Sequence, residues 1–184
     1  ADREDASNKL GSGNWFEYGS ALRQTALIVE PAETGRIPPL TEQGKALQAG
    51  MKSSWNGEVF ERREDFNSLD RCITRGMPAT MLPFPYNNGV RIFQSPGWVV
   101  IDFEMIHEQR FIPLDGRPQL ADGLKTWLGS SRGHWDGNTL VVETTNFNGL
   151  SPMAIVGPSN GAAGIPTSTS MKIVEHFTPY GEGK

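Results

Sequence analysis

The segment 134–147 constrains the fold of this chain most. Residues 134–135 and 139–147 have the composition of strands, and Asp136-Gly137 lies between them. A tight turn between antiparallel strands needs positive φ angles, which glycine adopts without steric cost. The segment therefore predicts a β-hairpin, and the fold must contain at least one antiparallel strand pair.

Five further short segments, rich in β-branched and aromatic residues and bounded by turn residues, also predict strands. They are residues 25–30, 90–94, 98–107, 109–113 and 171–178. Two segments predict helices, residues 41–53 with Thr41 as the N-cap and residues 119–128. Because strands outnumber helices and follow one another through short turns, the predicted fold class is mainly β with minor α. We expect an antiparallel sheet or a small lipocalin-like barrel with one or two peripheral helices.

The length of 184 residues fits a single domain, 1–184, with its own hydrophobic core. Within it, residues 1–20 predict an irregular N-terminal arm. Residues 148–170, rich in Gly, Pro, Ser and Asn, predict a long loop. The one cysteine, Cys72, rules out an internal disulfide, and we expect a buried, inert thiol.

The charge and hydropathy patterns argue against two classes of partner. The net charge is −4 and acidic and basic residues are interspersed, so no nucleic-acid partner is expected. No apolar run is long enough to span a membrane, so no membrane partner is expected either.

Two motifs that resemble catalytic signatures fail in context. Residues 129–133 match the G-x-S-x-G nucleophile elbow, which requires a strand before the serine and a helix after it. Here the predicted order is reversed, so no nucleophilic serine is expected. The histidines, His107, His134 and His176, lack the spacing of a metal pair, and no nucleotide-binding loop is present. We therefore predict neither a metal nor a cofactor.

His107 is the first catalytic candidate. It ends the otherwise apolar face of the predicted strand 98–107. Half-burial there would move the pKa of the imidazole into a range useful for proton transfer. The alternative is a core histidine bonded to a backbone carbonyl.

Candidate binding residues lie on both sides of a segment fixed by prolines. Arg75, Tyr86, Asn87 and Asn88 supply donors and acceptors suited to a phenolate, carboxylate or hydroxyl group. Alternatively, the asparagines satisfy only their own turn. Two further pairs of alternatives stay open elsewhere in the chain. Arg110 either forms a local ion pair with the turn 114–118 or binds substrate. The tryptophans either build the core or line an aromatic cavity: Trp98, Trp127 and Trp135.

Six segments resemble a family of largely uncharacterised, often exported bacterial proteins. They are RCITRG (71–76), PYNN (85–88), EMIHE (104–108), IPLDGRP (112–118), WLGSSRGHWDGNTLVVETTNF (127–147) and VEHFT (174–178). The resemblance covers about residues 20–178. It extends to γ-formaldehyde lyases that act on lignin-derived phenylcoumaran dimers. It implies a periplasmic or exported protein, with a cytoplasmic one as the alternative.

The resemblance implies cofactor-independent loss of formaldehyde from a primary alcohol of a small aromatic molecule. His107 would be the base, oriented by Glu104 or Glu108, with His134 as a second acid or base. Arg75 or Arg110 would stabilise a phenolate. Tyr86, Asn87 and Asn88 would hold hydroxyl groups, and Trp98 would line the cavity.

Family members continue past the last predicted strand. The resemblance therefore implies that a barrel in this chain is closed differently, or is completed by a partner chain in a homo-oligomer. The alternative function is a non-catalytic, lipocalin-like binding protein for a small hydrophobic or aromatic ligand.

Overall fold

The computed structural model describes residues 39–52, 59–82, 87–153 and 164–179. Its strands form two three-stranded antiparallel sheets, each ordered as in the sequence. The first contains β1 (Val90–Ser95), β2 (Trp98–Phe103) and β3 (Gln109–Pro113), and the second β4 (Ser130–Asp136), β5 (Thr139–Thr145) and β6 (Ile173–Phe177). The mainly β prediction is confirmed. We predicted either an antiparallel sheet or a small barrel. The described strands form two antiparallel sheets and do not close into a barrel.

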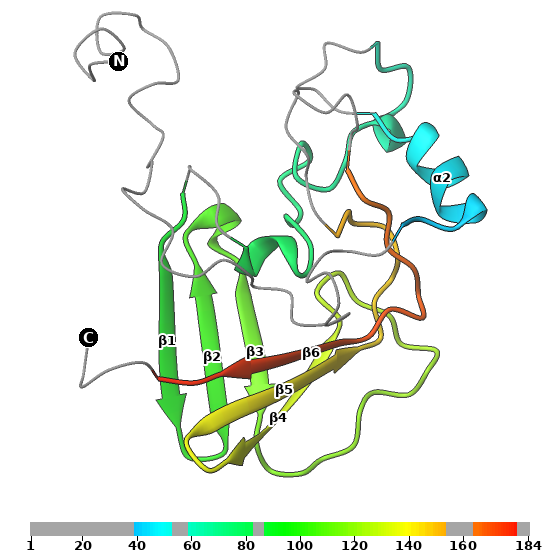
Figure 1. The fold of residues 1–184 in the computed structure, drawn as a ribbon. Coiled ribbons are helices and arrows are strands. Elements are labelled where there is room, and N and C mark those ends of the chain that lie inside the picture. The colour runs from blue at the N-terminus through cyan, green and yellow to red at the C-terminus, as the bar shows by residue number, and fades with distance from the viewer. Residues whose placement is uncertain (1–38, 53–58, 83–86, 154–163, 180–184) are drawn as a thin grey trace, which may run out of the picture.

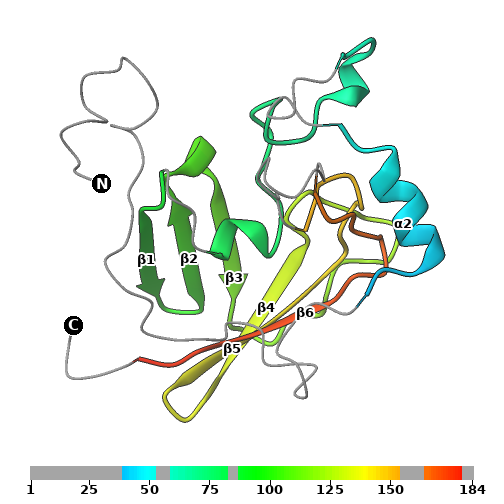
Figure 2. The same cartoon turned by 45° about the horizontal axis from the view of Figure 1, so that its top comes forward.

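The two sheets pack across one hydrophobic core. Figure 1 shows β4–β6 crossing in front of β1–β3, and Figure 2 shows the same crossing from a tilted view. The core residues come from both sheets: Val99, Ile101, Phe103, Ile112, Leu140 and Val142. In β2, buried residues alternate with partly exposed ones, as the two-residue period predicts. Burying each such side chain contributes roughly 1.5–3 kcal/mol to folding.

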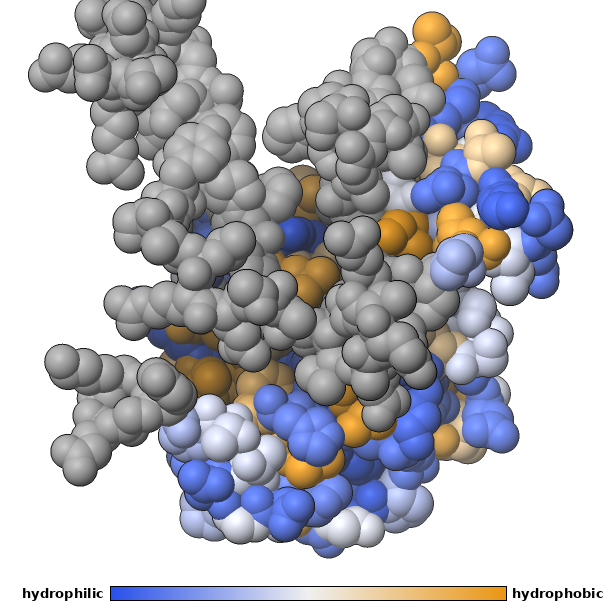
Figure 3. All heavy atoms as spheres, viewed as in Figure 1, coloured by the Kyte–Doolittle hydropathy of each residue, from blue (hydrophilic) through white to orange (hydrophobic). Residues whose placement is uncertain are grey.

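The predicted hairpin is confirmed. Asp136 pairs with Thr139, so Gly137 and Asn138 form the two-residue loop, and Gly137 has a φ of 59°. The outer face of this second sheet is turned toward the viewer in Figure 3, where the lower part of the described surface is mainly hydrophilic. One face of the sheet therefore meets the core and the other meets solvent.

The predicted strand 98–107 ends earlier, at Phe103. Asp102 pairs with Gln109 of the returning strand β3, so the chain must reverse between them. It does so through the short 3₁₀ helix η5 (Met105–His107). The turn is closed by a 2.9 Å hydrogen bond from the amide of Phe103 to the carbonyl of Glu108. The strand ends at Phe103, but the alternation of buried apolar residues continues to Met105.

The predicted helix 119–128 is wrong, because the segment is irregular. Asn146 Nδ2 donates to the carbonyls of Leu120, Ala121 and Leu124 at 3.3, 3.0 and 3.0 Å. Thr126 forms an isolated bridge to Phe147. These contacts with the residues just after β5 occupy backbone carbonyl groups that a helix would need for its own hydrogen bonds.

Helix α2 (Glu42–Ala49) lies to one side of the sheets and contains no buried residue (Figure 1). Thr41 Oγ1 accepts a 3.1 Å hydrogen bond from the amide of Gly44, which confirms the predicted cap. The helix ends at Ala49, earlier than predicted, with Gly50 as its C-cap. Gln48 ties it to the second half of the chain by donating to the carbonyl of Gly164 at 2.8 Å.

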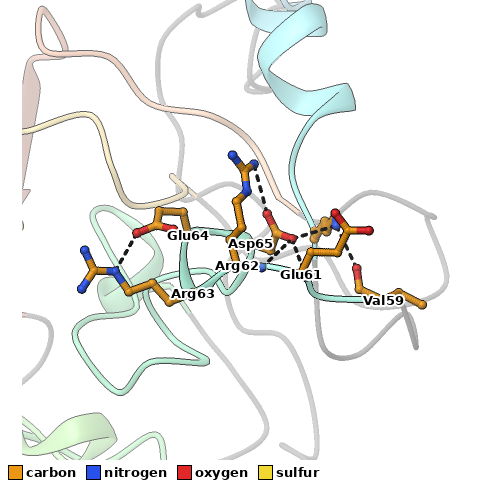
Figure 4. A network of polar contacts seen from close by, with 7 residues as sticks. Val59, Glu61, Arg62, Arg63, Glu64 and Asp65 are labelled. Atoms are coloured by element: carbon orange, nitrogen blue, oxygen red, sulfur yellow. Dashed lines mark hydrogen bonds and ion pairs between the residues drawn. The ribbon is translucent and has the colours of Figure 1, made fainter.

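An acidic residue organises the segment after this helix. Asp65, in the 3₁₀ helix η3 (Arg63–Asp65), accepts hydrogen bonds from the Lys52 ammonium at 2.9 Å and from the amide of Glu61 at 3.0 Å. Figure 4 shows Asp65 between Arg62 and Glu61. Hydrogen bonding from Lys52 holds the pKa of Asp65 well below its usual range.

Cys72 is exposed, so the prediction of a buried thiol is wrong. The predicted strand 25–30 and the arm 1–20 lie outside the described residues, as does part of the loop 148–170. Among the described residues, no helix has the length and apolar character needed to cross a bilayer.

Candidate functional site

Several predicted site residues meet in a small pocket beside the end of β2. The pocket has a volume of about 10 Å³, the room of one water molecule. Its lining residues are Arg75, Thr80, Asn87, Asn88, Gly89, Val90, Phe103 and Met105. Arg75, Asn87 and Asn88 are thus brought together from separate segments. Tyr86, predicted with them, lies outside the described residues.

The short 3₁₀ helix η4 (Ala79–Met81) positions Thr80 in this pocket. The backbone amide and the hydroxyl of Thr80 both donate to the carbonyl of Gly76 at 2.8 Å. Gly76 must be a glycine, because a Cβ there would lie 2.4 Å from the carbonyl oxygen of Pro152. Close packing therefore fixes the hydroxyl of Thr80 beside the pocket.

Glu108 lies behind Thr80. Its Oε2 is 3.5 Å from Thr80 Oγ1. Burial raises the pKa of Glu108, against the opposing effect of hydrogen bonds from Thr74 and Thr80. A carboxyl group with a raised pKa keeps its proton to a higher pH than an ordinary glutamate and is a stronger base once ionised, which suits a general acid or base.

Glu104 holds the loop that carries the asparagines. Its Oε2 accepts a 3.0 Å hydrogen bond from the amide of Gly89, and its own amide donates to the carbonyl of Gly89 at 2.9 Å. In a regular strand Glu104 would face away from His107, but the strand has ended at Phe103. The carbonyl of Glu104 accepts a 3.3 Å hydrogen bond from the amide of His107, whereas the hydrogen bond of its carboxylate comes from Gly89. The side chain of Glu104 therefore anchors the 87–89 loop.

Arg75 supplies a buried positive charge. Only 6% of the residue is exposed, and burial lowers its pKa to about 10, so the guanidinium stays protonated at neutral pH. Its Nη1 donates to the carbonyl of Leu82 at 3.2 Å. The pocket therefore has a fixed cation on one side and, behind Thr80, a carboxyl group with a raised pKa.

Both histidine candidates lie on the surface. His107 is exposed and has a φ of 53°, so the prediction that it is half-buried on a strand face is wrong. The reason is the reversal of the chain after Phe103. His134 is exposed on β4, in the other sheet. Neither histidine lines the pocket around Arg75.

Backbone strain concentrates at this corner. Asn87, Ile106 and His107 have φ angles of 47°, 62° and 53°. Positive φ is rare outside glycine and is a marked outlier for the β-branched Ile106. Such strain tends to persist where a functional geometry needs it.

The other two predicted binding residues line a different, larger cleft. Trp98 and Arg110 border a space of about 350 Å³ between β3 and β4. Arg110 is almost fully buried and is engaged by protein groups: Glu175, Ser131 and Thr144. The local ion pair in the turn 114–118 instead joins Arg117 to Asp115.

The G-x-S-x-G match has a structural explanation. Ser131 lies inside strand β4, and its Oγ accepts a hydrogen bond from Arg110 Nε at 3.0 Å. A Cβ on Gly133 would lie 2.7 Å from Leu114 Cδ2, and Gly129 has a φ of 72°. Packing and backbone conformation therefore account for both glycines.

Comparison of this chain with family models, curated proteins and solved structures gave no match. What the pocket can do therefore follows from its own residues. Thr80 of the pocket and Thr74 behind it had no signal in the sequence, and Glu108, which also lies behind the pocket, was expected only to orient a histidine.

Proposed function

We propose that the chain is a cofactor-independent lyase that releases formaldehyde from a lignin-derived aromatic dimer at the pocket around Arg75. One observation carries the proposal: Glu108, a carboxyl group with a raised pKa, lies behind Thr80, which lines the same pocket as Arg75. An acid–base group and a fixed cation are the two elements that this reaction needs.

The proposed proton path runs through Thr80. For this transfer the Thr80 hydroxyl turns its hydrogen from the Gly76 carbonyl to Glu108. Thr80 Oγ1 then takes the proton of the substrate's primary alcohol while its own proton passes to Glu108. The present separation of 3.5 Å is long for this transfer, but such contacts tighten when substrate binds. The path assigns Glu108 the role of base that the sequence suggested for His107.

Bond cleavage follows the loss of that proton. The alkoxide becomes the carbonyl of formaldehyde as the adjacent carbon–carbon bond breaks. The electron pair of that bond forms the stilbene double bond and expels the aryl ether oxygen as a phenolate. Arg75 stabilises the phenolate, which then takes up a proton, so atoms and charge balance.

The size of the pocket accounts for one of the two substrate groups that the reaction places there. A volume of about 10 Å³ holds a single hydroxyl group, for which Asn87 and Asn88 offer hydrogen bonds. The aromatic rings and the aryl ether oxygen would lie outside this volume, so the pocket must widen on binding before Arg75 reaches the phenolate. Export to the periplasm, which the resemblance implies, remains a prediction.

The test is incubation of the purified protein, without added cofactor, with lignin-type dimers that carry a primary alcohol. We expect formaldehyde and stilbene in equal amounts from the wild type, with at least a hundredfold lower rate in Glu108→Gln and Thr80→Val. His107→Ala serves as the matched control from the same turn. Loss of activity in His107→Ala with full activity in Glu108→Gln would return the role of base to His107.

A second candidate function is binding without chemistry. The 350 Å³ cleft between β3 and β4 favours it, because its volume lies within the range of ligand pockets. A protein of this kind would quench its tryptophan fluorescence with aromatic ligands and leave every dimer unchanged.

A further inference from the structure

The cleft between β3 and β4 lies at the junction of the two sheets. These two strands are consecutive in the sequence and contact each other, but they belong to different sheets. Strand β4 approaches Ile112 and Leu114 closely at Gly133, because glycine has no side chain to hold them apart. Next to this contact, a cleft of about 350 Å³ is open to solvent, and Pro113 and Arg132 are among its lining residues.

Part of the lining of this cleft is apolar and aromatic. On the β3 side, Trp98 pairs with Pro113, and Phe111 lies on the same face of the sheet. Leu120 and Leu128 line the cleft as well. Phe111 is 57% exposed, so a large apolar surface faces the opening. A flat aromatic ring would cover this surface and remove it from water.

The charges of the cleft are all positive. Its described lining includes Arg110, Arg117 and Arg132 but neither aspartate nor glutamate. Arg110 is neutralised by Glu175 and Arg117 by Asp115. None of the ion pairs between described residues involves Arg132, so one positive charge remains uncompensated there.

Arg132 is held rigidly by neighbouring oxygens. Its Nε donates to the carbonyl of Pro118 at 2.8 Å and to that of Arg117 at 3.2 Å. Its Nη1 donates to the carbonyl of Ser131 at 2.7 Å and to Ser130 Oγ at 3.0 Å. In the described part of the chain, Nη2 donates no hydrogen bond to a protein group. A guanidinium fixed in this way is ready to receive an anion without further ordering.

We propose that this cleft binds a small aromatic carboxylate, with the carboxylate on Arg132 and the ring against Phe111. The volume is at the low end of the range of ligand pockets, which suits a ligand with one ring. The inference does not depend on chemistry at the pocket around Arg75, since the two sites share no lining residue.

The test measures benzoate binding by calorimetry at low salt. We expect binding by the wild type, at least tenfold weaker binding of benzyl alcohol, and weaker benzoate binding as salt increases. Arg132→Gln and Phe111→Ala should each weaken benzoate binding at least tenfold. Arg91→Gln, which changes an exposed arginine on β1 outside the cleft, should leave it unchanged.

Three outcomes would overturn the inference: no benzoate binding by the wild type, equal binding of benzyl alcohol, or unchanged affinity in both cleft variants. Should Arg132→Gln fail to fold, Phe111→Ala decides the matter, because Phe111 is exposed and its truncation leaves the core intact. Formaldehyde release by Arg132→Gln separates the two sites: it persists if the lyase proposal holds, whatever the fate of benzoate binding.

Discussion

Arg110 on β3 and Glu175 on β6 form a two-pronged ion pair between the sheets. Arg110 Nη1 donates to Glu175 Oε1 at 3.0 Å, and Nη2 donates to Oε2. The same guanidinium donates to Ser131 Oγ at 3.0 Å and Thr144 Oγ1 at 2.8 Å. One side chain of the first sheet thereby contacts every strand of the second.

Removing one partner of this pair should strongly destabilise the fold. We expect Arg110→Met to lower the free energy of unfolding by about 3–5 kcal/mol, because it leaves the partly buried Glu175 carboxylate without its counter-charge. The double variant Arg110→Met/Glu175→Met should lose less. Urea unfolding measures both. The control is Lys172→Met, which breaks the exposed pair with Glu143 and should cost about 0–1 kcal/mol. An equal cost for Arg110→Met and the control would contradict this role.

Alanine in place of either motif glycine should destabilise the junction. In Gly133→Ala the new Cβ would lie 2.7 Å from Leu114 Cδ2 and 2.8 Å from Ile112 Cγ2. We expect a loss of about 1–3 kcal/mol, as for other overpacked cores. Gly129→Ala should cost at least as much, because of its φ of 72° and the Thr145 carbonyl at 2.6 Å. Gly123→Ala, with open space around it, is the control. If thermal unfolding showed an equal loss of stability in Gly123→Ala, the packing argument would be refuted.

Glu108→Gln should stabilise the protein as the pH rises. Burial raises the pKa of Glu108, so the folded state binds this proton more tightly than the unfolded state. Below the ordinary pKa of glutamate, about 4.3, the wild type has its full stability, and it loses part of it as the pH rises through the raised pKa. Glutamine has no such titration. Urea unfolding between about pH 4 and about pH 8 should therefore show a widening advantage for Glu108→Gln. A constant difference would mean that the carboxyl pKa is ordinary.

Asp65→Asn should show the opposite pH dependence. The Lys52 hydrogen bond holds the pKa of Asp65 below its usual range, so the charged form stabilises the fold. We expect a lower melting temperature for the variant at neutral pH. The difference should shrink as the pH falls below about 3.9, the ordinary pKa of aspartate, toward the lowered value. Glu64→Gln, whose partner Arg63 is exposed, is the control. A deficit that does not change with pH would point to packing rather than charge.

The parts of the fold that depend on local pattern were predictable. The alternation in β2 and the glycine of the 136–139 turn follow from neighbouring residues, and both are as expected. The helix predicted over 119–128 fails because Asn146, distant in sequence, bonds to its carbonyls. Local periodicity contains no information about such a contact.

The candidate site was predictable only in part. Arg75, Asn87 and Asn88 were chosen for their donors and acceptors, and the fold places them around one pocket. His107 was chosen from strand periodicity, which fails where the chain reverses after Phe103. Thr80 could not be found from the sequence, because its role depends on its 3.5 Å approach to Glu108, which is 28 positions away.

The proposed role of Glu108 is tested most directly by the pH dependence of formaldehyde release under single-turnover conditions. The lyase proposal predicts a rate that rises with pH through a pKa above the usual range of glutamate, and at least a hundredfold lower rate without that transition in Glu108→Gln. A pH transition that persists undiminished in Glu108→Gln, or an unchanged rate, would show that another group removes the proton.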